Sequence, residues 1–251
     1  MFTKVKTPRE IEAMRESGRM LGHVLKVIKE SVEPGQTGRE ISRMARQELK
    51  AMGGKAAFFG YQGYPDVICI SINDEIVHGI PNDEAFEEGD IVSFDFGVDY
   101  KGMITDAAIS VLIGGKGTME ATKLVKATEE SLNAAVKVIK DGVRVGDIGA
   151  AVQKVLDAGS YGIVRDLVGH GVGHYVHEDP NIANVGKAGT GPALQAGMTI
   201  AVEPMATLGD YKVSVDPDGW TIRTKDGSLS AHFEHTILIT EKGAEVLTKL
   251  N

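Results

Sequence analysis

The sequence predicts an α/β fold built from two related halves, and three observations point to it. Helix-start patterns open a pair of helices near residues 7–31 and 37–52, and a second pair is expected near residues 118–140 and 146–158. Runs rich in β-branched residues follow each helix pair. Residues 33–41 recur loosely at residues 140–148, an offset of 107. Two halves related in this way would bring their strands to a shared axis.

The first helix pair has the clearest start and stop signals. Thr7 with Glu10 and Thr37 with Glu40 both fit the capping-box pattern, and Pro8 suits the first helical position. The Gly-Gly pair at residues 53–54 predicts the end of the second helix.

Residues 91–113 read as two β-branched runs joined by a short turn at residues 99–102, which predicts a β-hairpin. If the turn is centred between Tyr100 and Lys101, Asp95 lies directly opposite Asp106, close enough for both carboxylates to bind one dinuclear metal site. A register shift of one residue would separate them, and two ordinary strand-end acids are the alternative. Phe94 and Phe96 favour the metal site, because they indicate a buried strand in which an unpaired carboxylate is unfavourable.

Further metal-ligand candidates lie in the second half of the chain. Glycines flank His170 and would allow close approach of backbone and metal, although three histidines in eight residues equally fit a polar cluster. We expect functional roles for His170 and His177 and none for His174. Glu203 and Glu234 each lie beside an apolar strand pattern, and a buried acid in such a strand needs a partner. The combined set is suited to two divalent metal ions and consists of Asp95, Asp106, His170, Glu203 and Glu234.

Composition bounds the domain count and the compartment. The chain has 251 residues, 42% hydrophobic and 25% charged, without a dividing linker, so residues 1–251 are expected to form one catalytic domain. The N-terminus lacks a hydrophobic signal core and the apolar stretches are short, so we expect a cytoplasmic protein that does not enter a membrane. A single cysteine, Cys69, excludes an internal disulfide and a thiolate-rich zinc site. It falls in an alternating strand pattern over residues 67–77.

Charge narrows the choice of partners. A net charge of −8 argues against general affinity for nucleic acid. Arg39, Arg43, Arg46 and Lys50 nevertheless form a basic stripe along the second helix. A solvated helix face explains the stripe most simply, and a weak, salt-sensitive docking surface for the ribosome is the alternative. The absence of a heptad or a long exposed apolar stripe predicts a monomer.

Taken together, these residues resemble the type I methionine aminopeptidases of the bacterial kind, members of the pita-bread, creatinase-like metallopeptidases. The resemblance covers nearly the whole chain and rests on eight motifs in order, at residues 61–65, 71–81, 95–97, 105–106, 169–171, 177–178, 202–204 and 233–236. It implies a pita-bread fold of two pseudo-symmetric halves, with antiparallel strands covered by helices. It also implies two divalent metal ions (Co, Mn, Fe or Zn) and removal of the initiator methionine from nascent chains whose second residue is small.

The resemblance assigns roles to the metal-ligand candidates. Asp95 would chelate one ion, Asp106 and Glu234 would bridge both, and His170 and Glu203 would complete the second. Glu203 would also carry a proton from water to the leaving amine.

The substrate-contacting residues are likewise implied by the resemblance. His177 would stabilise the oxyanion and His78 would contact the scissile amide. The walls of the methionine slot would include Tyr61, Tyr64, Cys69, Val176 and Trp220. A monovalent cation would bind near Asn73, Glu75 and Ser230, largely through backbone oxygens.

Two positions depart from the family pattern. Val176 replaces a residue that is often aromatic, so one wall of the slot would have a different shape. His232 stands where glutamine is common, and it either orients Glu234 from the same strand face or reaches solvent.

The sequence leaves two alternative functions open. Proline-specific peptidases and creatinases share the fold and the ligand logic, but they usually carry an extra N-terminal domain. A pita-bread module that has lost catalysis and only binds partners is the second, although such a module would be expected to have lost ligands.

Overall fold

Four α-helices occupy the positions that the sequence predicts, in a computed structural model that describes residues 2–250. Their bounds are α1 Pro8–Ser31, α2 Gly38–Met52, α3 Met119–Val138 and α4 Val145–Ala158. Both predicted capping boxes are present, and Gly53 ends α2 in the left-handed conformation with φ of 80°. Two short 3₁₀ helices, η1 Tyr61–Gly63 and η2 Ile113–Gly115, complete the helical elements of the described residues.

The strands form two main antiparallel sheets. The sheet of the first half contains β1 Lys55–Ala56, β2 Ile68–Ile72, β4 Ile91–Tyr100 and β5 Met103–Leu112. The sheet of the second half has the order β15-β14-β9-β7-β8, with bounds Ala244–Val246, His235–Ile239, Thr199–Val202, Gly169–Gly171 and Glu178–Ile182. Smaller three-stranded sheets join β3 Glu75–Val77, β11 Val213–Val215 and β12 Ile222–Thr224, and β6 Gly162–Ile163, β10 Met205–Thr207 and β13 Ser230–His232.

The two halves repeat each other down to single hydrogen bonds. The N–H of Gly35 donates to the carbonyl of Phe86 at 2.8 Å, and the N–H of Gly142 donates to the carbonyl of Leu194 at 2.9 Å. The donors are 107 residues apart and the acceptors 108, so the loose sequence repeat corresponds to a structural one.

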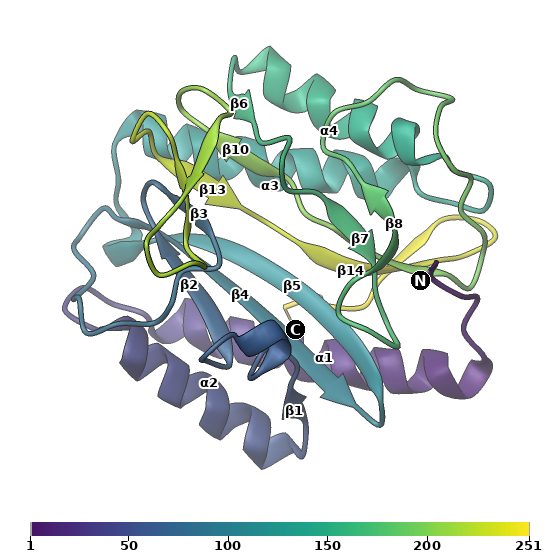
Figure 1. The fold of residues 1–251 in the computed structure, drawn as a ribbon, viewed down its shortest axis with the longest axis horizontal. Coiled ribbons are helices and arrows are strands. Elements are labelled where there is room, and N and C mark those ends of the chain that lie inside the picture. Colours follow the sequence, from purple (N-terminus) through teal and green to yellow (C-terminus); the bar gives the residue numbers. More distant parts are fainter. Residues whose placement is uncertain (1, 251) are drawn as a thin grey trace.

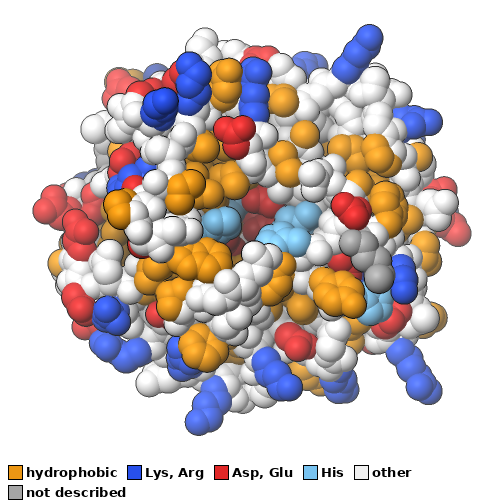
Figure 2. All heavy atoms as spheres, in the orientation of Figure 1, with side chains coloured by type: hydrophobic (Ala, Val, Ile, Leu, Met, Phe, Trp, Pro, Cys, Tyr) orange, Lys and Arg blue, Asp and Glu red, His pale blue; other side chains and the backbone are white. Residues whose placement is uncertain are grey.

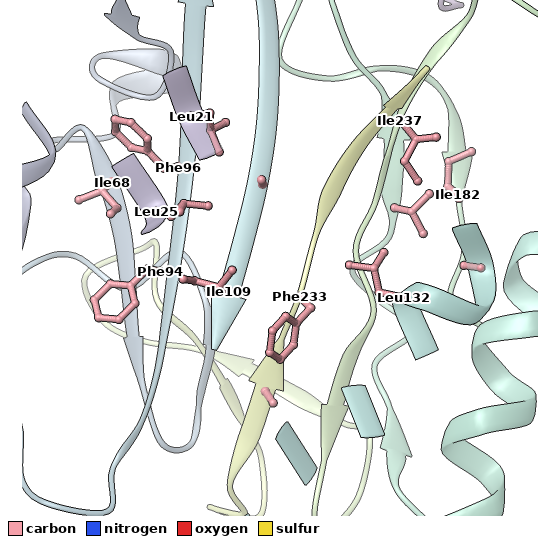
Figure 3. Close-up of a cluster of buried hydrophobic side chains, with 14 of the residues drawn as sticks. Leu21, Leu25, Ile68, Phe94, Phe96, Ile109, Leu132, Ile182, Phe233 and Ile237 are labelled. Atoms are coloured by element: carbon pink, nitrogen blue, oxygen red, sulfur yellow. The ribbon is translucent and has the colours of Figure 1, made fainter. Parts of the chain in front are cut away.

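Helices cover the strands from two sides. Figure 1 shows α1 and α2 along one side of the molecule, α3 and α4 along the other, and the strands between them. Side chains from both halves belong to one buried apolar cluster. Figure 3 shows it as two groups on either side of the central strands, with Leu21, Phe94 and Ile109 in the first half and Leu132 and Ile237 in the second. The core therefore holds the central strands in fixed positions from both sides.

The β4–β5 hairpin forms as predicted, but its register differs by two residues. Tyr100 pairs with Met103, so the turn consists of Lys101 and Gly102 alone. Both turn residues have positive φ, 53° and 80°, as a two-residue type I′ turn requires.

This register separates the two aspartates along the sheet. Asp106 pairs with Gly97, and Asp95 pairs with Ala108, so the predicted direct pairing of Asp95 with Asp106 is wrong. Because side chains alternate with a period of two, a shift of two residues keeps both carboxylates on one face, where they are diagonal neighbours.

The strand expected over residues 67–77 is interrupted. Asn73 adopts a positive φ of 56°, and the turn there separates β2 from β3. Cys69 lies in β2 and is buried.

None of the helices within residues 2–250 is long and apolar enough to cross a membrane.

Candidate active site

One pocket collects the site residues that the sequence predicts. Figure 2 shows a hollow on the face of the molecule with histidine and acidic side chains in it and hydrophobic side chains around it. The pocket is lined by every predicted divalent-metal ligand, Asp95, Asp106, His170, Glu203 and Glu234. It is also lined by every predicted substrate-contacting residue, Tyr61, Tyr64, Cys69, His78, Val176, His177 and Trp220.

Two of the acids come from different halves of the chain, Asp106 from β5 and Glu234 from the two-residue link between β13 and β14. The main chains of Ala108 in β5 and Glu234 bond each other in both directions, at 2.9 and 3.3 Å. This pairing brings Glu234 beside Asp106, and one ligand atom from each of Asp106, His170 and Glu234 lies within 4.8 Å of the others. Such a cluster has the residue types and the spacing of a metal-binding site.

Three acids of the pocket each have one buried carboxylate oxygen without a hydrogen-bond partner. Among the described residues, Asp95 Oδ1, Asp106 Oδ1 and Glu234 Oε1 are buried and accept no hydrogen bond. Burial raises the pKa of Asp95 to about 6, while His232 lowers it and Glu203 raises it further. Burial and the neighbouring acids raise the pKa values of Asp106 and Glu234 well above the usual range. Divalent cations would remove this penalty, because they stabilise the ionised form.

His170 is oriented in the way that a metal-ligating histidine requires. Its Nδ1 lies 2.9 Å from the carbonyl oxygen of Gly171. A proton on Nδ1 would satisfy that carbonyl and leave the Nε2 lone pair facing the pocket. Burial, followed by the charge of His177, lowers the pKa of His170 to about 3, so the ring is neutral at physiological pH.

Two further histidines face the pocket from opposite segments. Tyr61 Oη lies 3.0 Å from Nδ1 of His177, and the His177 and His170 ring centroids are 4.4 Å apart. His78 follows β3 with a positive φ of 61°, a backbone conformation that is uncommon for residues other than glycine. Burial, then the charges of His232 and His177, lowers the pKa of His78 to about 4.

His232 matches neither of the two alternatives that the sequence left open, because its ring does not reach solvent and makes no hydrogen bond to Glu234. Its side chain is 1% exposed, and its Nε2 lies 3.6 Å from Oε2 of Glu203. Glu234 follows after the end of β13, so the expected alternation along one continuous strand does not apply.

The opposite wall of the pocket is apolar. Phe58, Tyr64, Cys69 and Val176 are buried against one another, and the ring of Trp220 packs edge-on against Tyr64 with centroids 5.2 Å apart. Burial and nearby acids raise the pKa of Cys69, so its thiol is uncharged and acts as an apolar wall. Sequence reasoning missed Phe58, Gln62, Val77, Leu167 and Val168, which also line the pocket. Gln62 and Val77 lie within the motifs at residues 61–65 and 71–81, and Val168 adjoins the glycine-rich His170 segment, whereas Phe58 and Leu167 carried no signal.

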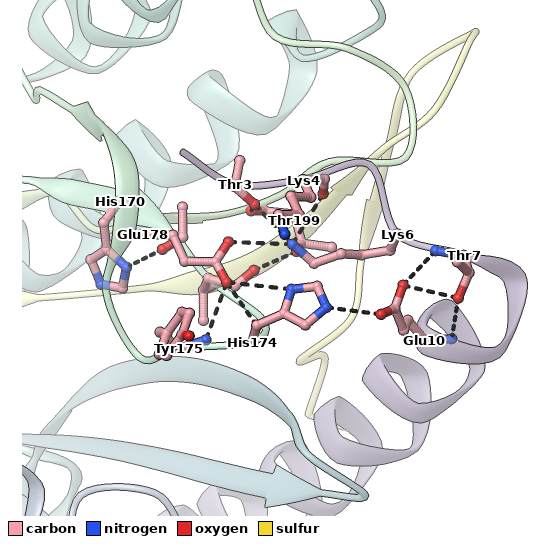
Figure 4. A network of polar contacts seen from close by, with 12 residues as sticks. Thr3, Lys4, Lys6, Thr7, Glu10, His170, His174, Tyr175, Glu178 and Thr199 are labelled. Atoms are coloured by element: carbon pink, nitrogen blue, oxygen red, sulfur yellow. Dashed lines mark hydrogen bonds and ion pairs between the residues drawn. The ribbon is translucent and has the colours of Figure 1, made fainter. Parts of the chain in front are cut away.

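His174, to which the sequence assigned no catalytic role, belongs to a polar network beside the pocket (Figure 4). Its Nε2 lies 2.8 Å from Glu10 Oε1, and its main-chain N–H donates to Glu178 Oε1 at 2.7 Å. Glu178 also receives the N–H of Tyr175 and pairs with the buried Lys6 ammonium at 3.4 Å. The network therefore fixes the segment that leads to His177.

The residues expected near a monovalent cation also lie together. The carbonyl oxygens of Asn73 and Glu75 are each 2.9 Å from Ser230 Oγ. The Glu75 carboxylate points elsewhere, because it accepts from the guanidinium of Arg223 at 2.6 Å. A cation at this place stays a prediction.

Comparison with known proteins gives consistent matches along the chain. Residues 12–241 match the model of metallopeptidase family M24. A methionine aminopeptidase from Aquifex aeolicus is 43% identical over the full length of both chains, and one from Escherichia coli is 40% identical over 99% of this chain and 94% of its own.

Solved structures agree with the sequence matches. A methionine aminopeptidase from Thermotoga maritima superposes with a TM-score of 0.97 and is 45% identical, covering 99% of this chain and 100% of its own. A prolidase from Pyrococcus furiosus has a TM-score of 0.79 at 23% identity, and the match spans 66% of that protein. The similarity to the prolidase therefore shows the fold alone.

Proposed function

Because this chain belongs to metallopeptidase family M24, and within it to the methionine aminopeptidases, we propose that it removes the initiator methionine from nascent proteins and peptides whose second residue is small. One observation carries the proposal. Three buried carboxylates, the half-buried carboxylate of Glu203 and a buried histidine share a pocket with an apolar wall suited to one side chain.

The protein residues fit two divalent metal ions. Asp95, Asp106, His170, Glu203 and Glu234 would hold them, and the unpaired buried oxygens of three of these acids support the assignment. Bound ions would supply Lewis acidity, which makes water a nucleophile near neutral pH and polarises the scissile carbonyl. Cobalt, manganese, iron and zinc all suit this donor set.

Glu203 is suited to move the proton. Its carboxylate lines the pocket, 3.6 Å from Nε2 of His170 and 3.6 Å from Nε2 of His232, and a positioned carboxylate is a common general acid–base. We assign to it the transfer from the attacking water to the departing amine.

Two histidines would bind the reacting amide. Tyr61 holds Nδ1 of His177, which leaves Nε2 to donate toward the oxygen that gains negative charge. His78 lies directly after β3 and lines the pocket, where it would contact the amide of the scissile bond.

The apolar wall would select the methionine side chain. An unbranched thioether fits against Tyr64, Cys69 and Trp220, where burial of apolar surface contributes about 25 cal/mol per Å². The small Val176 leaves more room at one end than an aromatic residue would.

We further propose that residues 1–251 act as one catalytic domain, as a monomer in the cytoplasm. The basic stripe on α2 is partly neutralised, since Arg39 pairs with Asp83 at 3.0 Å and Arg46 with Asp66 at 3.7 Å. Ribosome docking through this stripe would therefore be weak and salt-sensitive. Reversing the charge of Arg39, Arg43, Arg46 and Lys50 without any loss of ribosome co-sedimentation at low salt would contradict it.

Peptide specificity tests the proposed function. Metal-loaded protein should release methionine from Met-Ala-Ser and act far more slowly on Met-Leu-Ser, because the second residue must be small. An Ala-Pro-Ser peptide tests the alternative that the protein is a proline-specific peptidase. Hydrolysis of that peptide in preference to Met-Ala-Ser would overturn the proposal, and hydrolysis of neither would favour a binding module.

A further inference from the structure

His232 is a buried, unpaired polar side chain at the edge of the metal-ligand set. It ends β13, is 1% exposed, and neither ring nitrogen has a hydrogen-bond partner among the described residues. A neutral imidazole carries one donor and one acceptor, and both are expected to find partners when the ring is buried. A ring left open in this way next to a charged cluster indicates a function.

The ring lies against one oxygen of Glu203. His232 Nε2 is 3.6 Å from Glu203 Oε2, and His170 Nε2 is 3.6 Å from Glu203 Oε1. The Glu203 carboxylate therefore lies between two imidazoles, one at each oxygen. A shift of roughly 0.7 Å would bring Nε2 of His232 into ordinary hydrogen-bond distance of Oε2.

The backbone holds His232 firmly at this place. Its N–H donates to Ser110 Oγ at 2.8 Å, and the same hydroxyl lies 2.9 Å from its carbonyl oxygen. β13 also pairs with β10, where Met205 is the direct partner of His232. The backbone of His232 is therefore anchored, so that its ring can hold the Glu203 carboxylate in one position.

The two imidazoles differ in what their second nitrogen meets. Nδ1 of His170 faces the Gly171 carbonyl, the arrangement that directs the opposite lone pair toward a metal ion. Nδ1 of His232 has no such carbonyl among the described residues, so nothing fixes its proton on Nδ1. His232 is thus free to carry the proton on Nε2 and to donate it to Glu203.

We propose that His232 is a positioning residue, which donates a hydrogen bond from Nε2 to Oε2 of Glu203 and fixes that carboxylate for metal binding and proton transfer. The inference rests on the proposed function for its effect on the reaction. Its effect on metal affinity is independent of any peptidase activity.

Three variants test the donor directly. His232→Gln keeps an N–H donor, and His232→Leu and His232→Ala remove it. His235→Gln is the matched control, because His235 is a neighbouring half-buried histidine whose Nδ1 contacts Thr248 Oγ1 and which does not line the pocket. Metal-depleted protein is titrated with Mn²⁺ by calorimetry, and kcat and KM are measured on Met-Ala-Ser for each metal-loaded variant.

We expect His232→Leu to weaken the binding of one Mn²⁺ by 10- to 100-fold and to lower kcat with little change in KM. His232→Gln should stay within about threefold of the unaltered protein in Mn²⁺ affinity and in kcat. His235→Gln should bind Mn²⁺ with the affinity of the unaltered protein. If His232→Leu does not fold, as judged by circular dichroism, His232→Ala takes its place, because the alanine removes the donor with less steric demand.

Two results would overturn the inference. Equal losses of affinity in His232→Gln and His232→Leu would mean that the imidazole itself binds the metal, and unchanged affinity and kcat in His232→Leu would mean that it positions nothing. If no protein releases methionine, yet His232→Leu still weakens Mn²⁺ binding and His232→Gln does not, the proposed function fails and the positioning role stands.

Discussion

Ala108 and Glu234 exchange two main-chain hydrogen bonds across the boundary between the two halves, at 2.9 and 3.3 Å. The next contact joins Thr236, two residues after Glu234, to Asp106, two residues before Ala108. The Thr236 hydroxyl accepts the N–H of Asp106 and donates to the Asp106 carbonyl, both at 2.8 Å. The metal-ligand candidates Asp106 and Glu234 therefore lie on one continuous seam. The contact that joins the halves is the contact that assembles the site.

The first prediction concerns this seam. Thr236→Val keeps the shape of the buried side chain but leaves the N–H and the carbonyl of Asp106 without their partner. We expect the free energy of unfolding to fall by about 1–3 kcal/mol in urea titrations of the metal-depleted protein. Thr122→Val on the exposed face of α3 is the control and should change stability by less than about 0.5 kcal/mol. A Thr236→Val protein as stable as the control would contradict the structural role of the seam.

The second prediction concerns the buried ion pair of Lys6 and Glu178. Their side chains are 0% and 3% exposed, and the ammonium also donates to Thr3 Oγ1 at 2.9 Å. Lys6→Met would leave the Glu178 carboxylate buried without its cation, which should lower the free energy of unfolding by about 3–5 kcal/mol. The double variant Lys6→Met/Glu178→Gln should recover part of this loss. A double variant less stable than Lys6→Met would show that the loss does not come from an uncompensated charge.

The third prediction concerns Tyr61, whose hydroxyl lies 3.0 Å from Nδ1 of His177. Tyr61→Phe removes this partner while it keeps the pocket wall, so His177 loses its fixed orientation. We expect kcat on Met-Ala-Ser to fall about fivefold, as a hydrogen bond of about 1 kcal/mol implies. Tyr175→Phe is the control, because Tyr175 is 55% exposed and outside the pocket lining. Equal kcat values for Tyr61→Phe and Tyr175→Phe would show that Tyr61 does not position His177.

The fourth prediction is a pH dependence of the metal-depleted protein. Burial raises the pKa of Asp95 to about 6 and that of Glu203 to about 8, against about 4 for a carboxyl group in the unfolded chain. The folded state therefore holds protons that the unfolded state has released, so stability falls as pH rises from about 4 to about 8.

Bound metal should cancel this trend, because the cations stabilise the ionised carboxylates. We expect the urea midpoint of chelator-treated protein to be lower at pH 8 than at pH 5, and the stabilisation by Mn²⁺ to be larger at pH 8. A Mn²⁺ effect of the same size at both pH values would contradict the electrostatic description of the site.

The hairpin illustrates how far the sequence determined the site. Sequence alternation predicted that Asp95 and Asp106 share a face, and the structure agrees because the register error was two residues, one full period. The error came from the turn. The positive φ values of Lys101 and Gly102 allow a two-residue loop, which the residue types alone did not distinguish from a turn centred one residue earlier.

His232 illustrates what local sequence did not determine. Its spacing from Glu234 suggested a shared strand face, but β13 ends at His232 and a new strand begins at His235. Its neighbour Glu203 comes after β9, 29 residues earlier, so the contact depends on the packing of two sheets. The apolar pocket residues Phe58 and Leu167 were missed for the same reason, because nothing in their local pattern distinguishes a pocket wall from a core position.

The most direct test of the proposed mechanism is the release of free methionine from Met-Ala-Ser by metal-depleted protein during titration with Mn²⁺, Fe²⁺ or Co²⁺, in parallel with Glu203→Gln. We expect no release without metal, activity that rises with added ion in the unaltered protein, and a loss of at least about 100-fold in kcat for Glu203→Gln, since general acid–base catalysis contributes typically 10²–10⁴-fold. Full activity in the metal-depleted protein, or in Glu203→Gln, would contradict the mechanism.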